Sequence, residues 1–156
     1  MSTQLLAAFA ELEARLATIS TAGGFQTDLG AAVLPAGTYL DEDDAPCVAL
    51  YEAAPDEQGL MKLAALDEAN ACGLDFQVNY VAQAFVRRGE PQSALAAAEA
   101  VAADMMRALM GSNHGALDEA RGHRITGRAR GLTVKGANVI PVQVFGTFRI
   151  NEKVYE

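Results

Sequence analysis

The sequence predicts an α+β fold, in which a mostly antiparallel (mixed) β-sheet carries two α-helices packed on one face. Three observations predict it. Two stretches have apolar residues at helical spacing, one stretch of fourteen residues alternates with period two, and shorter apolar runs are separated by Gly and Pro. The chain has 156 residues, the size of one domain, so we expect a single domain over 1–156.

The first helix is predicted over 3–20. Its apolar side chains recur at spacings of three and four residues, which places them on one helical face. They are Leu5, Phe9, Leu12, Leu16 and Ile19. Gly23 and Gly24 follow as a stop, because glycine adopts the left-handed conformation of a helix C-cap without strain.

An acidic loop follows, made of four adjacent carboxylates: Asp41, Glu42, Asp43 and Asp44. A cation-binding loop needs alternating carboxylates and a glycine that turns the chain, and this run has neither. We therefore expect either a solvated loop or an acidic patch that faces a partner. Pro46 then leads into a short apolar strand, predicted at Cys47–Tyr51.

The region 53–73 has no clear pattern. Pro55 and Gly59 mark a turn, and 61–66 suits a strand or one helical turn. The pattern becomes clear at 74–87, where period-two alternation predicts a long strand that is half exposed for most of its length.

The second helix is predicted from Gly89-Glu90-Pro91 to Met110, since Pro is tolerated in the first turn and Gly111 supplies a stop. Its predicted apolar stripe is Leu95, Ala98, Ala102, Met105 and Leu109.

The C-terminal part is predicted to hold a polar, glycine-rich loop or weak strand over 111–131, and one or two strands over 132–154. Pro141 lacks a backbone donor, so it favours an edge strand or a strand start.

Charge is divided unevenly between the two halves. The net charge is −8, with −11 in residues 1–80 and +3 in residues 81–156. An acidic chain is a poor candidate for a whole-surface nucleic-acid binder. The asymmetry has two interpretations: two faces that attract each other within one monomer, or head-to-tail self-association of an acidic edge with a basic one.

The basic residues concentrate in one stretch, 121–135 (RGHRITGRARGLTVK), which has five bases, one histidine and no acid. It contains no aromatic residue that could stack on nucleic-acid bases. We consider a flexible loop, pairing with an acidic edge of a neighbour, or contact with the phosphates of passing DNA. The candidate interface residues are Arg121, Arg124, Arg128 and Arg130, opposite Asp41, Glu42, Asp43 and Asp44.

Catalytic and metal signatures are weak. The sequence has no GxSxG, HExxH, P-loop or CxxC. His114 and His123 lack thiol or carboxylate partners at ligand spacing, and Cys47 reads as a buried, inert thiol. With Cys72 as the only other cysteine, a disulfide scaffold is not expected. We expect no enzyme activity, cofactor, metal, membrane span or secretory signal.

A set of segments in fixed order carries a family resemblance. The leading helix LEARLATISTAGGF is followed by TDLG, with Thr27, Asp28 and Gly30 at the turn, and then by DEDDAPCVALYE. The strand LDFQVNYVAQAFV and the helix AVAADMMRAL, with Asp104, complete it. This order resembles the tail terminator (tail completion, head–tail joining) proteins of long-tailed bacteriophages, closely over 1–110 and loosely over 111–156.

The resemblance implies a structural virion protein located in the tail and neck region and made in the host cytoplasm. Such proteins form a hexameric ring on the tail tube, end its polymerisation and present a surface to the neck proteins. The implied partners are further copies of the chain, the tail tube protein, a neck or head-completion protein, and DNA that passes through the bore without sequence-specific binding.

Two alternatives remain. One is another head–tail junction component, such as a neck or stopper protein. The other is a small α+β ligand-binding domain or enzyme, which would need convergent polar groups in a pocket. Its candidates Asp75, Asn79 and Tyr80 lie on one strand, and alternation divides them between two faces.

The ring interpretation gives a specific hypothesis. The acidic loop 41–44 of one copy faces the basic stretch 121–135 of the next copy or of a tube subunit, because a ring needs an interface whose two sides differ. An exposed strand edge near Pro141 is expected to help join sheets between subunits.

Overall fold

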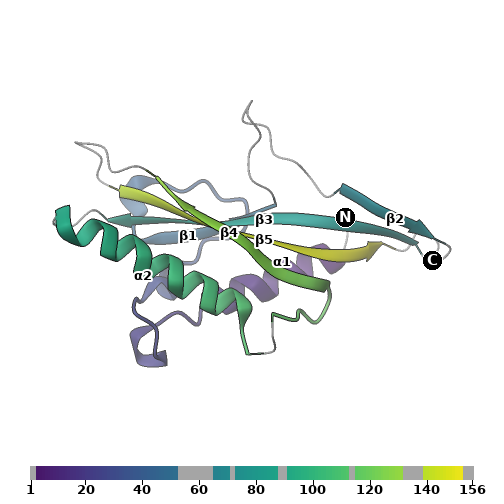
Figure 1. Cartoon of the computed structure of the whole chain (residues 1–156), viewed down its shortest axis with the longest axis horizontal. Coiled ribbons are helices and arrows are strands. Elements are labelled where there is room, and N and C mark those ends of the chain that lie inside the picture. Colours follow the sequence, from purple (N-terminus) through teal and green to yellow (C-terminus); the bar gives the residue numbers. More distant parts are fainter. Residues whose placement is uncertain are drawn as a thin grey trace.

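The computed structural model describes residues 3–52, 65–70, 73–87, 91–112, 115–131 and 139–152. Within them, five strands form one sheet and two helices lie on one of its faces (Figure 1), which confirms the predicted α+β class. The predicted turn at Pro55 and Gly59, together with Cys72, His114 and 132–138, lies outside the described residues. The extent of the domain over 1–156 stays a prediction.

The sheet has the strand order β1-β3-β5-β4, and β2 also pairs with β3. Every strand pair is antiparallel. The strands are β1 (Cys47–Tyr51), β2 (Ala65–Asn70), β3 (Gly73–Arg87), β4 (Arg121–Arg130) and β5 (Val139–Glu152). The predictions of a short strand at Cys47–Tyr51 and a long strand at 74–87 are therefore confirmed. The expectation that the long strand is half exposed is wrong, because only Asn79 and Arg87 of β3 are exposed and the rest are buried or partly buried.

Two expectations about the C-terminal strands need correction. The loop interpretation of 121–130 is wrong, because these residues form strand β4. Shifts in its register, between 121 and 124 and between 125 and 127, disturb the alternation that would have marked it as a strand. Pro141 lies third in β5, an inner strand between β3 and β4, so it marks a strand start and not a sheet edge. The hypothesis of an exposed joining edge near Pro141 is therefore wrong.

The helices are α1 (Thr3–Leu16) and α2 (Pro91–Met110). The predicted stripe of α1 is confirmed: Phe9, Leu12 and Leu16 are buried and Leu5 is partly buried. The helix ends at Leu16, four residues earlier than expected. A 3-10 turn, η1 (Thr21–Gly23), follows, and Gly24 at φ +87° caps it in the left-handed conformation.

In α2 one predicted core position is wrong. Leu95 is 50% exposed, and the buried side of this end of the helix begins at Ala94. The cause is composition, because alanines form most of the buried face of α2. The spacing of the larger residues alone therefore predicts the wrong boundary for that face. The buried α2 residues are Ala94, Ala98, Val101, Ala102, Met105, Ala108 and Leu109.

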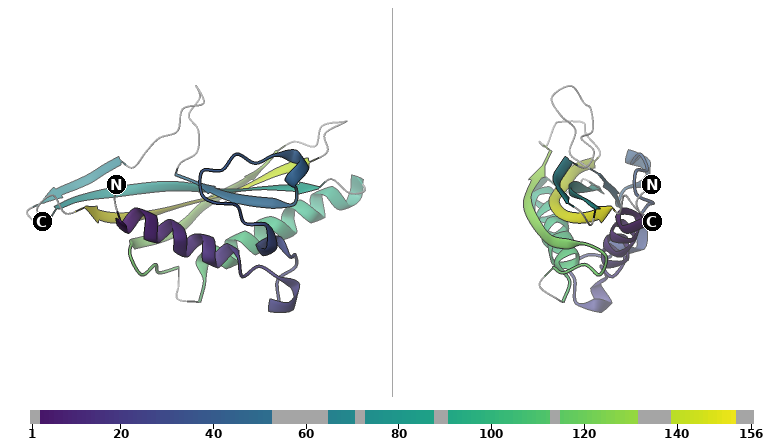
Figure 2. Two further views of the ribbon diagram at one scale, coloured as in Figure 1. Left: turned by 180° about the vertical axis from the view of Figure 1, so that it is seen from behind. Right: turned by 90° about the vertical axis from the view of Figure 1, so that its right-hand side faces the viewer.

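The core lies between the helices and the even-numbered residues of β1, β3 and β5. Successive side chains of a strand point to opposite faces, so these positions share the face that the helices cover. Buried residues on this face include Val48, Leu50, Val78, Tyr80, Ala82, Ala84, Val86, Ile140, Val142, Val144, Phe148 and Ile150. In the end-on view on the right of Figure 2, β4, in light green, lies at the left of the molecule, and the purple-to-blue N-terminal segment lies at the right.

Candidate interaction surface

The acidic loop lies beside β1. All four of its residues are exposed, and 42–44 form a short 3-10 turn, η3 (Glu42–Asp44). The Asp41 carboxylate accepts a hydrogen bond from the Asp43 backbone N–H at 3.0 Å, so Asp41 caps this turn. The Asp43 carbonyl accepts from Arg87 at 3.3 Å. The loop is thus fixed by local bonds and keeps its other carboxylates directed to solvent.

The predicted basic residues lie on β4 but divide between its two faces. Arg128 and Arg130 are on the helix-covered side, where Arg128 Nη1 lies 2.9 Å from Glu99 Oε2 of α2 and Arg130 Nε lies 4.0 Å from Glu99 Oε1. Arg124 pairs with Thr147 in the ladder and is exposed. Arg121 forms an ion pair with Asp75 at 3.1 Å. The four arginines therefore do not form one patch.

The structure does not bring the acidic loop and the basic strand together within one chain. The loop precedes β1, the first strand in the sheet order, and the arginines lie on β4, the last. Two inner strands separate them. Attraction between the two halves within one monomer is therefore not seen between this loop and these arginines; among the four arginines, it is seen only in the ion pair of Arg121 with Asp75.

An open groove runs between α2 and β4, which we name the α2–β4 groove. Its lining residues are Ala98, Glu99, Ala102, Arg128, Ala129, Arg130 and Val142. Ala98, Ala102 and Val142 lie buried beneath it, and the side chains of Arg128 and Arg130, each 48% exposed, stand at its rim beside Glu99. The charge of this rim is one unit positive.

A large exposed side chain accompanies the acidic loop. Tyr39 is 95% exposed, the most exposed large apolar side chain among the described residues. Sequence reasoning did not single out Tyr39 or Glu99. A tyrosine two residues before a run of carboxylates, outside any periodic segment, is a signal that could have drawn attention to Tyr39, whereas nothing in the sequence pairs Glu99 with β4.

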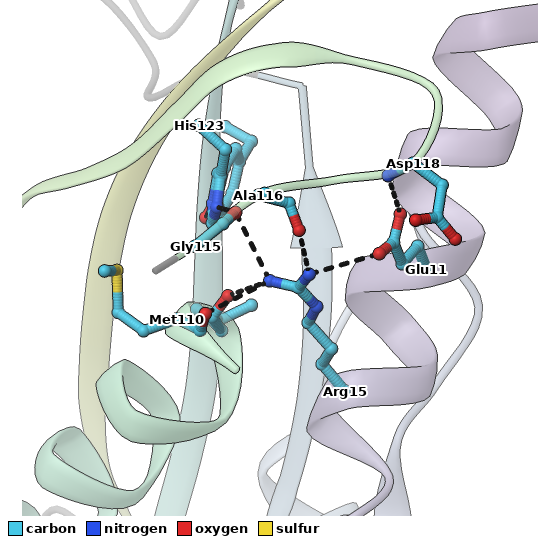
Figure 3. A network of polar contacts seen from close by, with 9 residues as sticks. Glu11, Arg15, Met110, Gly115, Ala116, Asp118 and His123 are labelled. Atoms are coloured by element: carbon cyan, nitrogen blue, oxygen red, sulfur yellow. Dashed lines mark hydrogen bonds and ion pairs between the residues drawn. The ribbon is translucent and has the colours of Figure 1, made fainter. Parts of the chain in front are cut away.

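A partly buried polar network fixes the approach to β4 (Figure 3). The Arg15 guanidinium of α1 donates to the carbonyls of Leu109 at 2.7 Å and of Ala116, and forms an ion pair with Glu11 at 3.1 Å. Glu11 in turn accepts from the Asp118 backbone N–H at 2.9 Å. A positive side chain thus satisfies carbonyls at the C-terminal end of α2, where the helix dipole favours a cation.

The network continues to a buried histidine on β4. His123 Nδ1 lies 2.6 Å from the Gly115 carbonyl, so this nitrogen carries the proton and donates. Nε2 then accepts from the Tyr80 hydroxyl at 2.6 Å. Burial is the main cause that lowers the pKa of His123, and burial raises the pKa of Tyr80. Both ring nitrogens have protein partners, so this arrangement is structural.

Tyr80 reaches His123 by crossing β5 at a glycine. Tyr80 on β3 lies opposite Gly146 on β5, which lies opposite Ile125 on β4. A Cβ at Gly146 would lie 2.3 Å from the Tyr80 ring. A residue with a side chain at this position would block the ring, so the glycine allows β3 and β4 to be joined across the strand between them.

The remaining candidates for chemistry are consistent with structural roles. Cys47 is buried, and desolvation raises the pKa of its thiol, which disfavours the reactive thiolate. Among the described residues, no group of three or more His, Cys, Asp or Glu side chains could hold a metal ion. In the same part of the chain, no helix has the length and hydropathy needed to cross a membrane.

Two acidic residues of the segments that resemble the family, Asp104 and Asp28, form hydrogen bonds that stabilise the fold. The Asp104 carboxylate, 2% exposed, accepts from the backbone N–H groups of Gln26 and Thr27 and from the Thr27 hydroxyl, at 2.7–3.1 Å. Asp28 accepts from the backbone and hydroxyl of Thr21, and these bonds lower its pKa. These contacts hold the turn after α1 against α2 and direct the chain toward β1.

Comparison with known proteins gives a fold relationship. A scan against protein-family models finds no match, and a search of curated proteins finds none either. Among solved structures, the chain is similar to one from the virion of a native gene transfer agent (GTA) particle. The match has a TM-score of 0.63 and covers 97% of this chain and 100% of that chain, at 15% sequence identity. This chain therefore has the same fold as that virion chain over nearly its whole length.

Proposed function

We propose that this chain is a structural protein of a phage-like virion, in which copies form a ring that caps the tail tube. The observation that carries the proposal is the likeness to a virion chain over 97% of this chain and all of the other. A fold alone does not fix a function. The proposal also draws support from the acidic loop and the arginines at opposite edges of the sheet, because a ring needs an interface with two different sides.

In this proposal the ring has six copies of the 16.4-kDa chain. It ends the polymerisation of the tail tube on one side and offers a surface to a neck or head-completion protein on the other. DNA passes through the bore without being read. The net charge of −8 suits that passage, because like charge weakens non-specific binding to the phosphate backbone.

The test is electron microscopy of particles from a producing host that lacks the gene. Over-long tail tubes that are not joined to filled heads would support the terminator role. Tails of normal length that fail to join heads would replace it with the second candidate, a neck or stopper protein. Intact, infectious particles would refute both.

A complementary measurement locates the protein. Gold-labelled antibody against the chain should mark the head–tail junction of intact particles. Label distributed along the tail or over the capsid would contradict the proposed position, whatever the phenotype of the deletion.

A further inference from the structure

Two features at opposite edges of the sheet could meet a partner. At the β1 edge, Tyr39 holds a whole aromatic side chain in solvent, 95% exposed, next to the acidic loop. At the β4 edge, the α2–β4 groove is open between small side chains. Tyrosine is enriched at protein interfaces, where the ring supplies apolar contact area and the hydroxyl a hydrogen bond, so this exposed ring is a candidate contact with a partner.

The groove is suited to an aromatic side chain beside negative charge. It has a volume of about 320 Å³, and the short side chains of Ala98, Ala102 and Val142 lie buried beneath it. Its rim carries Arg128 and Arg130, and Glu99 neutralises only one of their two charges. An arginine can also stack on the face of a tyrosine ring.

We propose that the occupant of the α2–β4 groove is a second copy of this chain, which inserts Tyr39 and places its acidic loop against Arg128 and Arg130. The inference deepens the proposed function and rests on it, because it names the surface through which ring subunits meet. It also narrows the interface expected from the sequence: Arg121 and Arg124 lie outside the groove.

Three observations favour a second copy over an unrelated partner. Both complementary surfaces belong to the same chain, and their charges are opposite. Two inner strands separate them, so one chain cannot satisfy both by itself. The resulting contact joins different surfaces of the two copies, and repetition of such a contact builds a ring or a filament.

The test is analytical ultracentrifugation at an ionic strength of about 0.01 M, where charges act over about 30 Å. The wild-type chain should associate with rising concentration. The acidic-edge variant combines Tyr39→Ser with Asp43→Asn and Asp44→Asn and retains Asp41, which caps η3. The basic-edge variant is Arg128→Gln with Arg130→Gln. Each variant alone should associate at least about thirtyfold more weakly, the effect of losing one interface hot spot.

A matched control lies on the same strand. Arg121→Gln with Arg124→Gln removes the same charge from β4 but outside the groove, and it should associate like the wild type. The sharpest arm is a mixture of the two edge variants. Each retains one intact edge, so an equimolar mixture should form dimers of one copy of each and nothing larger.

The proposal is overturned by any of four results: a wild-type chain that stays monomeric at every concentration, edge variants that associate normally, a control that weakens as much as they do, or a mixture that forms no dimer. Circular dichroism of each variant confirms folding. Failure here, with over-long tails in the gene deletion, would leave the ring in place with a different interface. Success here, with normal particles, would leave the self-association and remove the virion role.

Discussion

The two edges of the sheet are finished in different ways. At β1, the segment 33–37 lies along the strand as a strap: the Leu34 N–H donates to the Val48 carbonyl at 2.8 Å, and the Gly37 N–H donates to the Leu50 carbonyl at 2.7 Å. At β4, no described residue pairs with the outer side of the strand. This strand is instead held from within, through β5 and through the Tyr80–His123 bond.

The two edges differ in how they are held in place and in whether another chain can reach them. An open edge invites pairing with other chains, and proteins usually cover it or place charges on it. The β1 edge is covered by the chain itself. The β4 edge carries exposed arginines, which oppose indiscriminate strand pairing, while its position is fixed by buried contacts. The β1 part of one edge is thus closed, whereas the β4 edge is rigid yet accessible.

The largest effect should come from breaking the internal support of β4. Gly146→Ala would place a Cβ against the Tyr80 ring and force it away from His123. We expect a loss of about 2–3 kcal/mol in the free energy of unfolding, typical of overpacking a core. Urea denaturation measures it. Gly127→Ala is the control, because its Cβ would meet nothing closer than Phe145 at 4.0 Å. Equal losses in both variants would contradict the role of Gly146.

A smaller loss in the free energy of unfolding should follow from changing Asp104, which holds the turn that leads toward the segment 33–37 beside β1. In Asp104→Asn an amide group faces backbone donors that the carboxylate accepted. We expect destabilisation of about 2 kcal/mol, since a buried donor is left without its acceptor. Thermal unfolding compares this variant with Asp28→Asn, an exposed carboxylate in the same turn, which should lose less. The reverse order would refute the assignment.

A substitution within the strap, the segment 33–37, should lower the free energy of unfolding by a smaller amount. Gly37 has φ +82° and no neighbour near its missing Cβ, so Gly37→Ala adds only backbone strain, about 1 kcal/mol. Hydrogen exchange should rise at β1 amides and stay unchanged at β4. Faster exchange at both edges would mean that the edges are not independent.

The smallest effect should be a pH dependence confined to the β4 side. Burial lowers the pKa of His123 below its ordinary 6.5, so the unfolded chain binds a proton more readily than the folded one. Stability is therefore full above about pH 6.5 and falls as the pH drops below it, by at most about tenfold in the unfolding equilibrium per pH unit. Tyr80, Arg15 and Glu11 are the groups near the ring.

Hydrogen exchange at about pH 7 and about pH 5, corrected for intrinsic rates, checks this prediction. Amides of β4 should lose protection at the lower pH, whereas those of β1, which has no histidine, should change less. His123→Gln should remove the difference between the edges. A wild-type response equal at both edges would refute it.

Much of the fold could be predicted because its main elements are strongly periodic. The stripe of α1 and the alternation in β3 are visible in the residues alone, and both are confirmed. Leu95 was misplaced because alanines, which are ambiguous between core and surface, form the real stripe of α2. Strand β4 was hard to recognise because arginine and glycine dominate it and bulges interrupt its register.

The candidate surface was predictable only in its charges. The acidic loop and the arginines stand out in the sequence, but their separation depends on strand order, which differs from chain order: β5 enters between β3 and β4. The division of the arginines between two faces depends on the bulges. The exposure of Tyr39 and the presence of the groove could not be predicted, because both depend on how distant segments pack and no local sequence pattern records that packing.

The place of β5 also determines when a new chain can finish its sheet. During synthesis β4 leaves the ribosome before β5, its only described strand partner, and β3 likewise waits for half of its ladder. A chain interrupted before β5 has neither the β3–β5 ladder nor the β4–β5 ladder, so it cannot position the arginines of β4. Truncated products would therefore lack the basic edge through which the proposed self-association takes place.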